Sequence, residues 1–407
     1  MINTPLTLPC GAIIKNRLCK AAMTERLCGR KGIPNKELIH LYKKWADTGA
    51  GLLITGNVMI DRNHLESAGN IIIDNDIVHP EFNAMAEAGK SQGSQIWVQI
   101  SHSGRQTSRF VNFRPKSASD VQLNKMGLFG RPRAMSEEDI HDVINGYVRA
   151  ARVCREAGFT GVQIHSAHGY LLSQFLSPIT NKRNDQWGGS LENRSRLLLT
   201  IVNKTREALG SDYPISVKLN SADFQRGGFT EEESIEVIKK LEDSGIDLLE
   251  ISGGTYEKVV FFLMNGENTK ESTKSREAYF LDFAEKVRTI TNLPLMVTGG
   301  FRTRSFSSKA IEDGAIDMIG MARPFITNLG EIKGFISGAT ENLLDLVIRT
   351  GVADLEETAE AGFYARNLIR IAQGKDVEFK YSSFGNAAFF VKHELVKGMA
   401  RRLLGSR

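Results

Sequence analysis

One segment of the chain, residues 137–165, reads EEDIHDVINGYVRAARVCREAGFTGVQIH. Its first part has the apolar spacing of an amphipathic helix, and Ser136 with Asp139 resembles a capping box at the helix start. Ala157-Gly158 suits a helix C-cap, and Gly161–His165 is a short apolar run typical of a buried strand. The segment therefore predicts a helix that is followed at once by a strand.

The same alternation of strand and helix continues along most of the chain. The predicted strands are Leu18–Met23, Gly51–Thr55, Gln95–Ile100, Gly161–His165, Ile215–Leu219, Asp247–Ile251, Leu295–Val297 and Asp317–Met321. The predicted helices lie near residues 36–48, 81–93, 137–157, 191–209, 231–244, 277–291 and 304–313. Eight strands alternating with helices favour a closed parallel (β/α)8 TIM barrel over a doubly wound sheet.

Other segments are predicted to decorate this barrel. Residues 6–14 alternate around a Pro/Gly turn, which predicts a small hairpin that plugs the barrel bottom. Two long connections, about residues 103–135 and 253–276, each follow a strand, so we expect them at the catalytic C-terminal face as lids or binding walls.

The chain after about residue 340 is helical and charged. We expect residues 1–340 to form the barrel and residues 341–407 to form a helical extension of the same domain. The last stretch, Met399–Leu404, is basic and amphipathic, and a solvated terminal helix is favoured over a membrane-surface role.

The composition indicates an ordinary globular protein. Of 407 residues, 41% are hydrophobic and 24% are charged, and the formal net charge of +5 is mild for this length. No clustered basic stripe points to nucleic acid, and no apolar run is long enough to span a bilayer. The four cysteines, at positions 10, 19, 28 and 154, show no spacing for a zinc or iron–sulfur site. We therefore expect a cytoplasmic protein without a metal, and leave homo-oligomer formation open.

Three chemically active side chains follow the fourth predicted strand. His165 ends that strand, and His168 and Tyr170 follow within five residues, where barrel enzymes place their active sites. Two imidazoles suit zinc, but the neighbouring strand ends offer Gln99 and Lys218, which are poor metal ligands. The alternative use is donation of hydrogen bonds to an oxygen that gains negative charge, with the tyrosine as proton donor.

The ends of the last two strands predict a phosphate site. Gly299-Gly300 follows the seventh strand, and Ala322-Arg323-Pro324 follows the eighth. Barrels often bind phosphate at these loops, because glycines let backbone N–H groups approach and a helix N-terminus adds positive potential. One phosphate indicates a mononucleotide cofactor, and no GxGxxG sequence follows the first strand.

Over roughly residues 5–330 the chain resembles the Old Yellow Enzyme family of FMN-dependent ene-reductases. The longest matching run is QIHSAHGYLLSQFLSP, residues 163–178, and it continues through WGGSLENR, residues 187–194. Shorter matches occur at residues 6–17, at the first-strand end Ala22-Met23-Thr24, at residues 51–56 and at residues 98–105.

The resemblance implies a role for each matching residue. Thr24, at the strand end that also holds Ala22 and Met23, would hydrogen-bond the flavin. The backbone near Gly56 and the amide of Gln99 would hold its pyrimidine ring.

Further along the chain, Gly299 and Gly300, together with Ala322 and Arg323, match the phosphate site. His165 and His168 would hold the oxygen of the substrate, and Tyr170 would give a proton to its α carbon.

Three positions depart from the family pattern. Lys218 stands where the family usually has arginine beside the flavin N1, which keeps the charge but loses the planar fork. Ala22 replaces a common proline, and Arg26 replaces an aromatic residue near the substrate in one subgroup. The changes at Ala22 and Arg26 bear on the size and preference of the substrate pocket, and not on the flavin.

The resemblance implies an NAD(P)H-dependent flavin oxidoreductase that reduces the C=C bond of α,β-unsaturated carbonyl or nitro compounds. Alternative substrates with the same flavin chemistry are a dienoyl thioester, a nitro compound or an N-methyl amine. Two alternatives of other classes are a metal-dependent barrel hydrolase or lyase that uses His165 and His168, and a barrel that binds a ligand without turnover.

Overall fold

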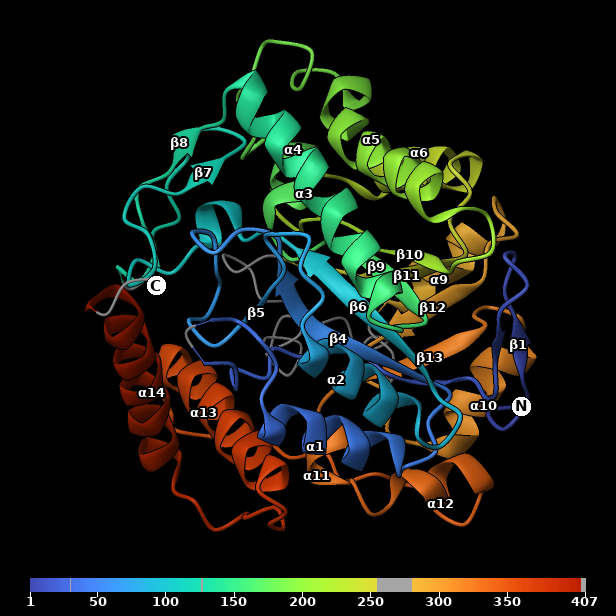
Figure 1. Ribbon diagram of the computed structural model, residues 1–407. Helices are drawn as coiled ribbons and strands as arrows, with labels where there is room; N and C mark the ends of the chain where they lie inside the picture. Colours follow the sequence, from blue (N-terminus) through green and yellow to red (C-terminus); the bar gives the residue numbers. More distant parts are fainter. Residues whose placement is uncertain (30, 126, 255–279, 404–407) are drawn as a thin grey trace.

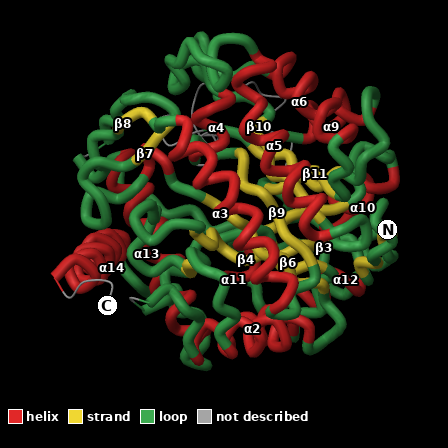
Figure 2. Tube along the Cα trace, turned by 45° about the horizontal axis from the view of Figure 1, so that its top comes forward, coloured by secondary structure: helices red, strands yellow, loops and turns green. Residues whose placement is uncertain are grey.

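The computed structural model describes every residue except 30, 126, 255–279 and 404–407. Eight parallel strands form the centre and helices surround them (Figures 1 and 2). The strands are β3 (Leu18–Lys20), β4 (Leu52–Met59), β6 (Gln95–Ser101), β9 (Gly161–Ser166), β10 (Ile215–Asn220), β11 (Leu248–Ser252), β12 (Leu295–Thr298) and β13 (Met318–Met321). The prediction of a closed TIM barrel is confirmed.

Closure depends on the short strand β3. It pairs in parallel with β13 on one side and with β4 on the other, so the first strand joins the last. The two-residue strand β5 (Ile71–Ile72) adds to the end of β4. Because all eight barrel strands are parallel, their C-terminal ends meet at one rim of the barrel.

The opposite end of the barrel is filled by apolar side chains. The hairpin of β1 (Leu6–Thr7) and β2 (Ile13–Ile14) is antiparallel, as expected from the sequence. Its buried residues pack with inward-facing side chains of several strands in one cluster, which comprises Leu6, Leu8, Ile14, Cys19, Leu52, Ile54, Trp97, Leu248, Met296 and Met318. The hairpin therefore plugs the N-terminal end, and polar chemistry is left to the other rim.

The helices around the barrel match the predicted positions closely. They are α1 (Lys36–Ala46), α2 (Pro80–Lys90), α3 (Glu137–Glu156), α5 (Leu191–Leu209), α6 (Glu231–Asp243), α9 (Leu281–Arg288) and α10 (Arg304–Glu312). The capping box of Ser136 and Asp139 at the start of α3 is present in both directions. A short helix, α4 (Leu171–Leu176), follows β9 and was not predicted.

Strand β4 is longer than the apolar run Gly51–Thr55 predicts. It continues to Met59, and its register with β6 shifts between Ile54 and Asn57. A glycine and a polar residue interrupt the apolar pattern at this point, and a bulge accommodates them within the strand. The bulge lies towards the rim that the C-terminal ends of the strands form. We call this the active rim, because barrel enzymes place their active sites there.

The chain after the barrel forms α11 (Pro324–Thr327), α12 (Ile332–Ser337), α13 (Ala353–Ala372) and α14 (Ser383–Leu403). α13 packs on α14, α1 and α11. Ion pairs join Arg26 to Glu394 of α14 and Lys125 to Glu357 of α13. In Figure 1 these two helices and the N-terminal hairpin lie on opposite sides of the barrel. The predicted helical extension is therefore attached to loops of the active rim.

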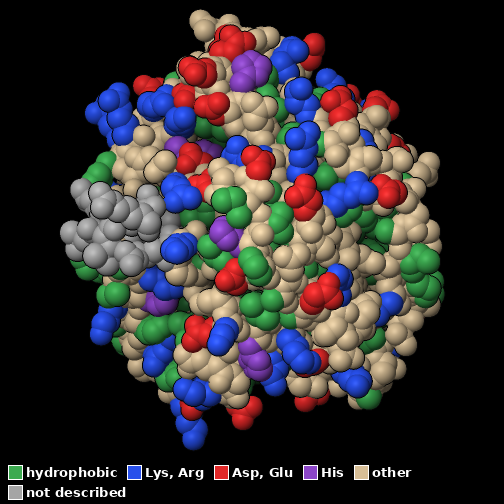
Figure 3. All heavy atoms as spheres, in the orientation of Figure 1, with side chains coloured by type: hydrophobic (Ala, Val, Ile, Leu, Met, Phe, Trp, Pro, Cys, Tyr) green, Lys and Arg blue, Asp and Glu red, His purple; other side chains and the backbone are tan. Residues whose placement is uncertain are grey.

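Positive and negative side chains are interspersed over the face drawn in Figure 3. Within the described residues, no helix combines the length and the apolar character needed to cross a bilayer.

A lysine is buried between the barrel and α1. Lys20 is fully buried, its Nζ donates to the Ile54 carbonyl at 2.7 Å, and it lies 4.1 Å from the centre of the Trp45 ring. Burial lowers the pKa of Lys20 to about 8 from its ordinary 10.5, although Glu25 opposes the shift. The folded protein therefore holds this proton less tightly than the unfolded chain does.

The variant K20M is expected to remove a pH-dependent part of the stability. Between about pH 8 and 10.5 the unfolded chain binds this proton and the folded protein does not, so wild-type stability should rise with pH by up to about 3 kcal/mol relative to K20M. Urea unfolding at a series of pH values measures the difference. K309M, at an exposed lysine of α10, is the control, and parallel curves for wild type and K20M would contradict the assignment.

Candidate active site

The two histidines and the tyrosine of the sequence motif meet at the end of β9. The ring centres of His165 and His168 are 5.3 Å apart, and those of His165 and Tyr170 are 4.8 Å apart. His168 has a φ of 58°, and Gly169 follows with a φ of 75°. A left-handed conformation is uncommon for a residue with a side chain, and such residues concentrate at functional sites. This turn brings the three rings together.

Both imidazoles are neutral at neutral pH. Burial is the main cause that lowers the pKa of His165 and of His168 well below 6.5, and the nearby charge of Lys218 lowers both further. The His168 backbone N–H donates to Asn220 at 3.0 Å, and its Nε2 lies 2.7 Å from the Ser252 hydroxyl. Neighbouring strand ends thus fix the orientation of this ring.

A carboxylate that the sequence did not reveal lies at the same place. Glu66, in the loop after β4, accepts hydrogen bonds from the hydroxyl groups of Thr24 and Tyr170. It also accepts a hydrogen bond of 2.6 Å from the Asn57 side chain. The strand ends of β3, β4 and β9 therefore converge on one side chain. No local signal marks Glu66, because its partners are distant in the sequence.

The barrel interior contains a polar network beside this cluster. Lys218 pairs with Glu250 at 2.8 Å, and both side chains are nearly inaccessible. The Gln99 amide donates to the Gln163 side chain at 2.7 Å, and the Gln163 amide donates to Glu250 at 2.7 Å. The Thr298 hydroxyl also donates to Glu250, at 2.6 Å. A buried charge is tolerated when it is paired and hydrogen-bonded. The predicted residues Lys218 and Gln99 thus belong to one network, through the unpredicted Glu250.

The predicted residues after β3 lie against the bulge of β4. A Cβ on Gly56 would come within 2.2 Å of the Met23 carbonyl, so only glycine allows this approach. The Gly56 N–H donates to the buried Glu25 at 2.9 Å. Ala22, Met23 and Thr24 are partly accessible. The contact places this segment next to the second strand.

The candidate phosphate site joins the ends of β12 and β13. Gly299 and Gly300 have φ angles of 116° and 89°, which favour glycine. Among the described residues, the backbone N–H groups of Gly300 and Ala322 have no hydrogen-bond acceptor. Arg323 follows as the N-cap of α11. Free N–H groups beside a guanidinium can receive an anion.

A carboxylate from the C-terminal extension contacts this site. The Arg323 Nη1 lies 2.7 Å from Glu360 Oε1 of α13. Burial raises the pKa of Glu360, while Arg323 opposes the shift. An anion at Arg323 would therefore share the guanidinium with Glu360.

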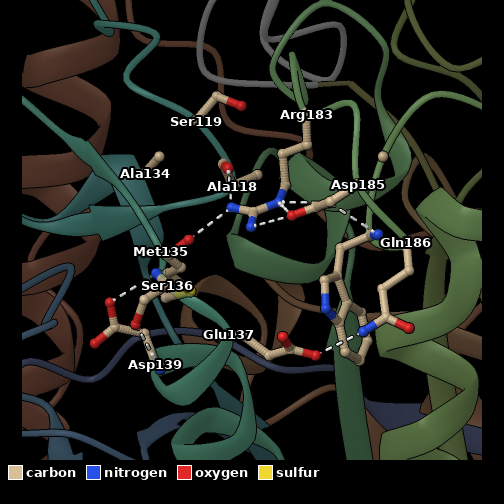
Figure 4. Close-up of polar contacts among 12 residues, drawn as sticks. Ala118, Ser119, Ala134, Met135, Ser136, Glu137, Asp139, Arg183, Asp185 and Gln186 are labelled. Carbon is tan, nitrogen blue, oxygen red and sulfur yellow. Dashed lines mark hydrogen bonds and ion pairs between the residues drawn. The ribbon is translucent and has the colours of Figure 1, made fainter.

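Arg183, which lies in the long matching run, connects two segments next to the site. Figure 4 shows Arg183 between two segments, where it donates to the Met135 carbonyl at 2.7 Å and to the Ala118 carbonyl at 3.2 Å. Its other nitrogens bind Asp185 at 2.6 to 3.1 Å. Trp187 is buried, as expected for a packing residue. Arg183 therefore holds the wall of residues 103–135 against the segment after β9.

His102 takes part in a different cluster. Its ring stacks on that of His64 at 4.3 Å, and Asp61 completes a group with possible metal-ligand atoms. In the hydrogen-bonded arrangement, His64 Nδ1 lies 2.6 Å from Asp61, and its Nε2 accepts from the Lys116 backbone at 2.8 Å. Both ring nitrogens of His64 are thus occupied, and the group supports the loop after β6. Arg105 is buried in the same loop.

Among the described residues, this is the one group with three possible metal ligands close together, and it does not include His165 or His168. The alternative of a metal-dependent hydrolase finds no third ligand for these two imidazoles in that part of the chain. The second predicted wall, residues 253–276, lies almost entirely outside the described residues.

The sequence matches known proteins over most of its length. Residues 2–330 match the model of the NADH:flavin oxidoreductase / NADH oxidase family. The chain is 41% identical over 329 residues to the NADH-dependent flavin oxidoreductase nadA of Aspergillus parasiticus, covering 76% of this chain and 72% of the relative. It is 34% identical over 350 residues to the NADH-dependent flavin oxidoreductase iliE of Hypocrea jecorina, covering 80% and 86%.

Solved structures agree with these matches. An old yellow enzyme homologue from Zymomonas mobilis superimposes with a TM-score of 0.70 at 25% identity, over 84% of this chain and 94% of the other. A 2-naphthoyl-CoA reductase complex superimposes with a TM-score of 0.76 at 28% identity, over 83% of this chain and 52% of the other. The chain therefore belongs to the Old Yellow Enzyme family, and it is an NAD(P)H-dependent oxidoreductase that uses FMN.

Proposed function

We propose that the enzyme reduces the carbon–carbon double bond of small alkenes that are conjugated to a carbonyl or nitro group. The observation that carries this proposal is the cluster of two neutral imidazoles and one phenol at the end of β9. Such a substrate needs hydrogen-bond donors at an oxygen that gains negative charge, and a proton at the α carbon. The cluster offers both.

The residues around the cluster fit FMN. The N–H groups of Gly300 and Ala322, which have no acceptor in the described part of the chain, would hold the phosphate together with Gly299 and Arg323. Bound FMN supplies the chemistry of accepting a hydride from NAD(P)H and passing it to the β carbon of the substrate.

The flavin ring would lie between the network of Lys218 and Gln99 and the segment of Ala22, Met23 and Thr24, against Gly56. The buried positive charge of Lys218 would favour an anionic reduced ring. Because the carboxylate of Glu250 pairs with Lys218, it would offset part of this positive charge and weaken the stabilisation of the anionic ring.

The side chains of this chain divide the remaining work. His165 and His168 would each donate a hydrogen bond to the carbonyl or nitro oxygen, where charge develops during the reaction. Desolvation lowers the pKa of both imidazoles and so keeps them neutral, although His168 is partly accessible. Tyr170, which is 4% exposed, would give its phenolic proton to the α carbon.

We also infer that residues 341–407 extend the barrel domain and do not form a separate unit. Helix α13 packs on α1 and α11, and its Glu360 contacts the candidate phosphate site. Two further ion pairs join the extension to the rim loops.

Steady-state assays test the proposal. Purified enzyme that is bleached by NADH or NADPH is supplied with a conjugated enone, a nitroalkene, a dienoyl thioester or a nitro compound. An N-methyl amine is an electron donor, so it is supplied to the oxidised enzyme, and bleaching of the flavin reports its oxidation. Reoxidation that is fastest with the enone or nitroalkene, with the saturated product formed, supports the proposal. Turnover of the amine or nitro compound alone would replace it with flavin chemistry on another substrate.

The variant R323A is expected to weaken FMN binding by roughly 1.5–3 kcal/mol, because a charge-assisted contact to the phosphate is lost. Titration of the apoprotein by flavin fluorescence measures this. E360Q should bind FMN more tightly, because it removes a carboxylate that repels the phosphate. R304A, on the neighbouring helix α10, is the control. Unchanged affinity in R323A would place the phosphate elsewhere.

The variant Y170F is expected to slow reoxidation by an alkene by roughly 10²–10⁴-fold, because the proton donor is lost. Reduction of the bound flavin by NAD(P)H should keep its wild-type rate, since that step needs no phenol. Stopped-flow absorbance separates the two half-reactions. Y213F, at a phenol that donates to the Phe159 carbonyl ahead of β10, is the control. Equal losses in both half-reactions would contradict the role.

Replacing both histidines, in H165N/H168N, is expected to weaken the binding of a phenolate to the oxidised enzyme about tenfold or more, because each imidazole contributes a hydrogen bond to an anion. Titration followed by flavin absorbance gives the dissociation constant. H141N, at an exposed histidine of α3, is the control. A phenolate affinity equal to that of wild type would remove both histidines from the site.

A further inference from the structure

We propose that Glu66 replaces the proton that Tyr170 gives up in each turnover. This proposal rests on the proposed function, in which Tyr170 is the proton donor. It assigns a positioning and proton-transfer role to a side chain in the loop after β4, outside the short motifs by which the sequence resembles the family.

Three donors converge on the Glu66 carboxylate. The Thr24 hydroxyl binds Oε1, and the Tyr170 hydroxyl and the Asn57 amide bind Oε2. Tyr170 and Asn57 are buried, whereas Glu66 is partly accessible to solvent. The carboxylate therefore links the buried phenol to the surface of the site.

The proton balance requires such a link. When the Tyr170 O–H bond breaks and a C–H bond forms at the α carbon, a phenolate is left in direct contact with the Glu66 carboxylate. Two anions at this separation cannot both persist in a buried site, so one proton must enter. Glu66 takes that proton from solvent at its accessible side, which forms an O–H bond on the carboxyl group. This bond breaks when the proton passes to the phenolate and restores the phenol O–H bond of Tyr170.

The electrons come from the established half-reaction with NAD(P)H, so each turnover consumes one nicotinamide nucleotide, one alkene and one solvent proton. Thr24 and Asn57 keep their hydrogen bonds to the carboxylate throughout, which holds it against Tyr170 between turnovers.

The loop does not need Glu66 to keep its shape. The Ser67 backbone donates to Asn70 at 2.9 Å, and the Ser67 hydroxyl donates to Glu394 of α14 at 3.0 Å. The Gly69 carbonyl accepts from the Cys28 backbone at 3.1 Å. Ahead of Glu66, the Leu65 carbonyl accepts from the Ser108 backbone at 3.1 Å. These contacts anchor the loop on both sides of Glu66, so the carboxylate is available for a role at the phenol.

The test compares single and multiple turnovers in the holoenzyme. E66Q keeps the size of the side chain but cannot accept and release a proton as a carboxylate does, and E66A opens space for a small acid. E394Q makes the same chemical change and touches the same loop through Ser67, without contact to Tyr170 in the described structure. Reoxidation of pre-reduced enzyme by an alkene gives the first turnover, and assays with saturating NAD(P)H give the steady state.

E66Q and E66A are expected to keep the wild-type rate of the first turnover, because Tyr170 still carries its own proton. Their steady-state rate should fall about tenfold or more, the lower part of the range for a proton-transfer group. Acetate should restore E66A and leave E66Q unchanged. E394Q should behave as wild type.

A second readout needs no turnover. The affinity of the oxidised holoenzyme for a phenolate, followed by flavin absorbance, should be retained in E66Q, because the histidines that bind the oxygen are untouched. A loss of this affinity, or an equal loss of rate in the first turnover and the steady state, would overturn the proposal, because Glu66 would then only shape the site.

An E66Q enzyme with the wild-type steady state would also overturn it. If Y170F slows alkene reduction and E66Q does not, only the role of Glu66 fails. If Y170F has no effect, or if wild type reduces no alkene, the proposed function fails and the role of Glu66 fails with it.

Discussion

The closure of the barrel through β3 is the constraint on which the site depends. This strand has three residues, yet it pairs with both β13 and β4 and completes the ring. With all strands parallel, Thr24, Tyr170 and Arg323 follow different strands and still reach one rim. The hairpin and the apolar layer close the N-terminal end of the barrel, so the polar side chains act at the C-terminal rim.

The sequence predicted the fold well because buried parallel strands are short apolar runs with clear helical segments between them. All eight strands were located from this contrast. The end of β4 was missed, since Gly56 and Asn57 interrupt the apolar run and a bulge absorbs them. Helix α4 was missed because it is only six residues long and wholly buried.

The candidate site was predictable where its residues are adjacent in the chain. His165, His168 and Tyr170 lie within one turn, and the structure brings their rings together as the sequence suggested. Glu66, Glu250 and Glu360 were not predictable. Each is a carboxylate whose partner lies on another strand end or helix, and such pairings are set by tertiary structure, which leaves no local pattern.

The contact between Arg323 and Glu360 has a thermodynamic consequence. If Arg323 holds the FMN phosphate as proposed, the cofactor and α13 share one guanidinium. Linkage is reciprocal: if the contact with Glu360 makes the free energy of cofactor binding less favourable, bound cofactor makes the docking of α13 less favourable by the same amount. The helical extension would then report occupancy of the flavin site: its attachment to the barrel would differ between the cofactor-free and the cofactor-bound enzyme, at a distance from the reacting atoms.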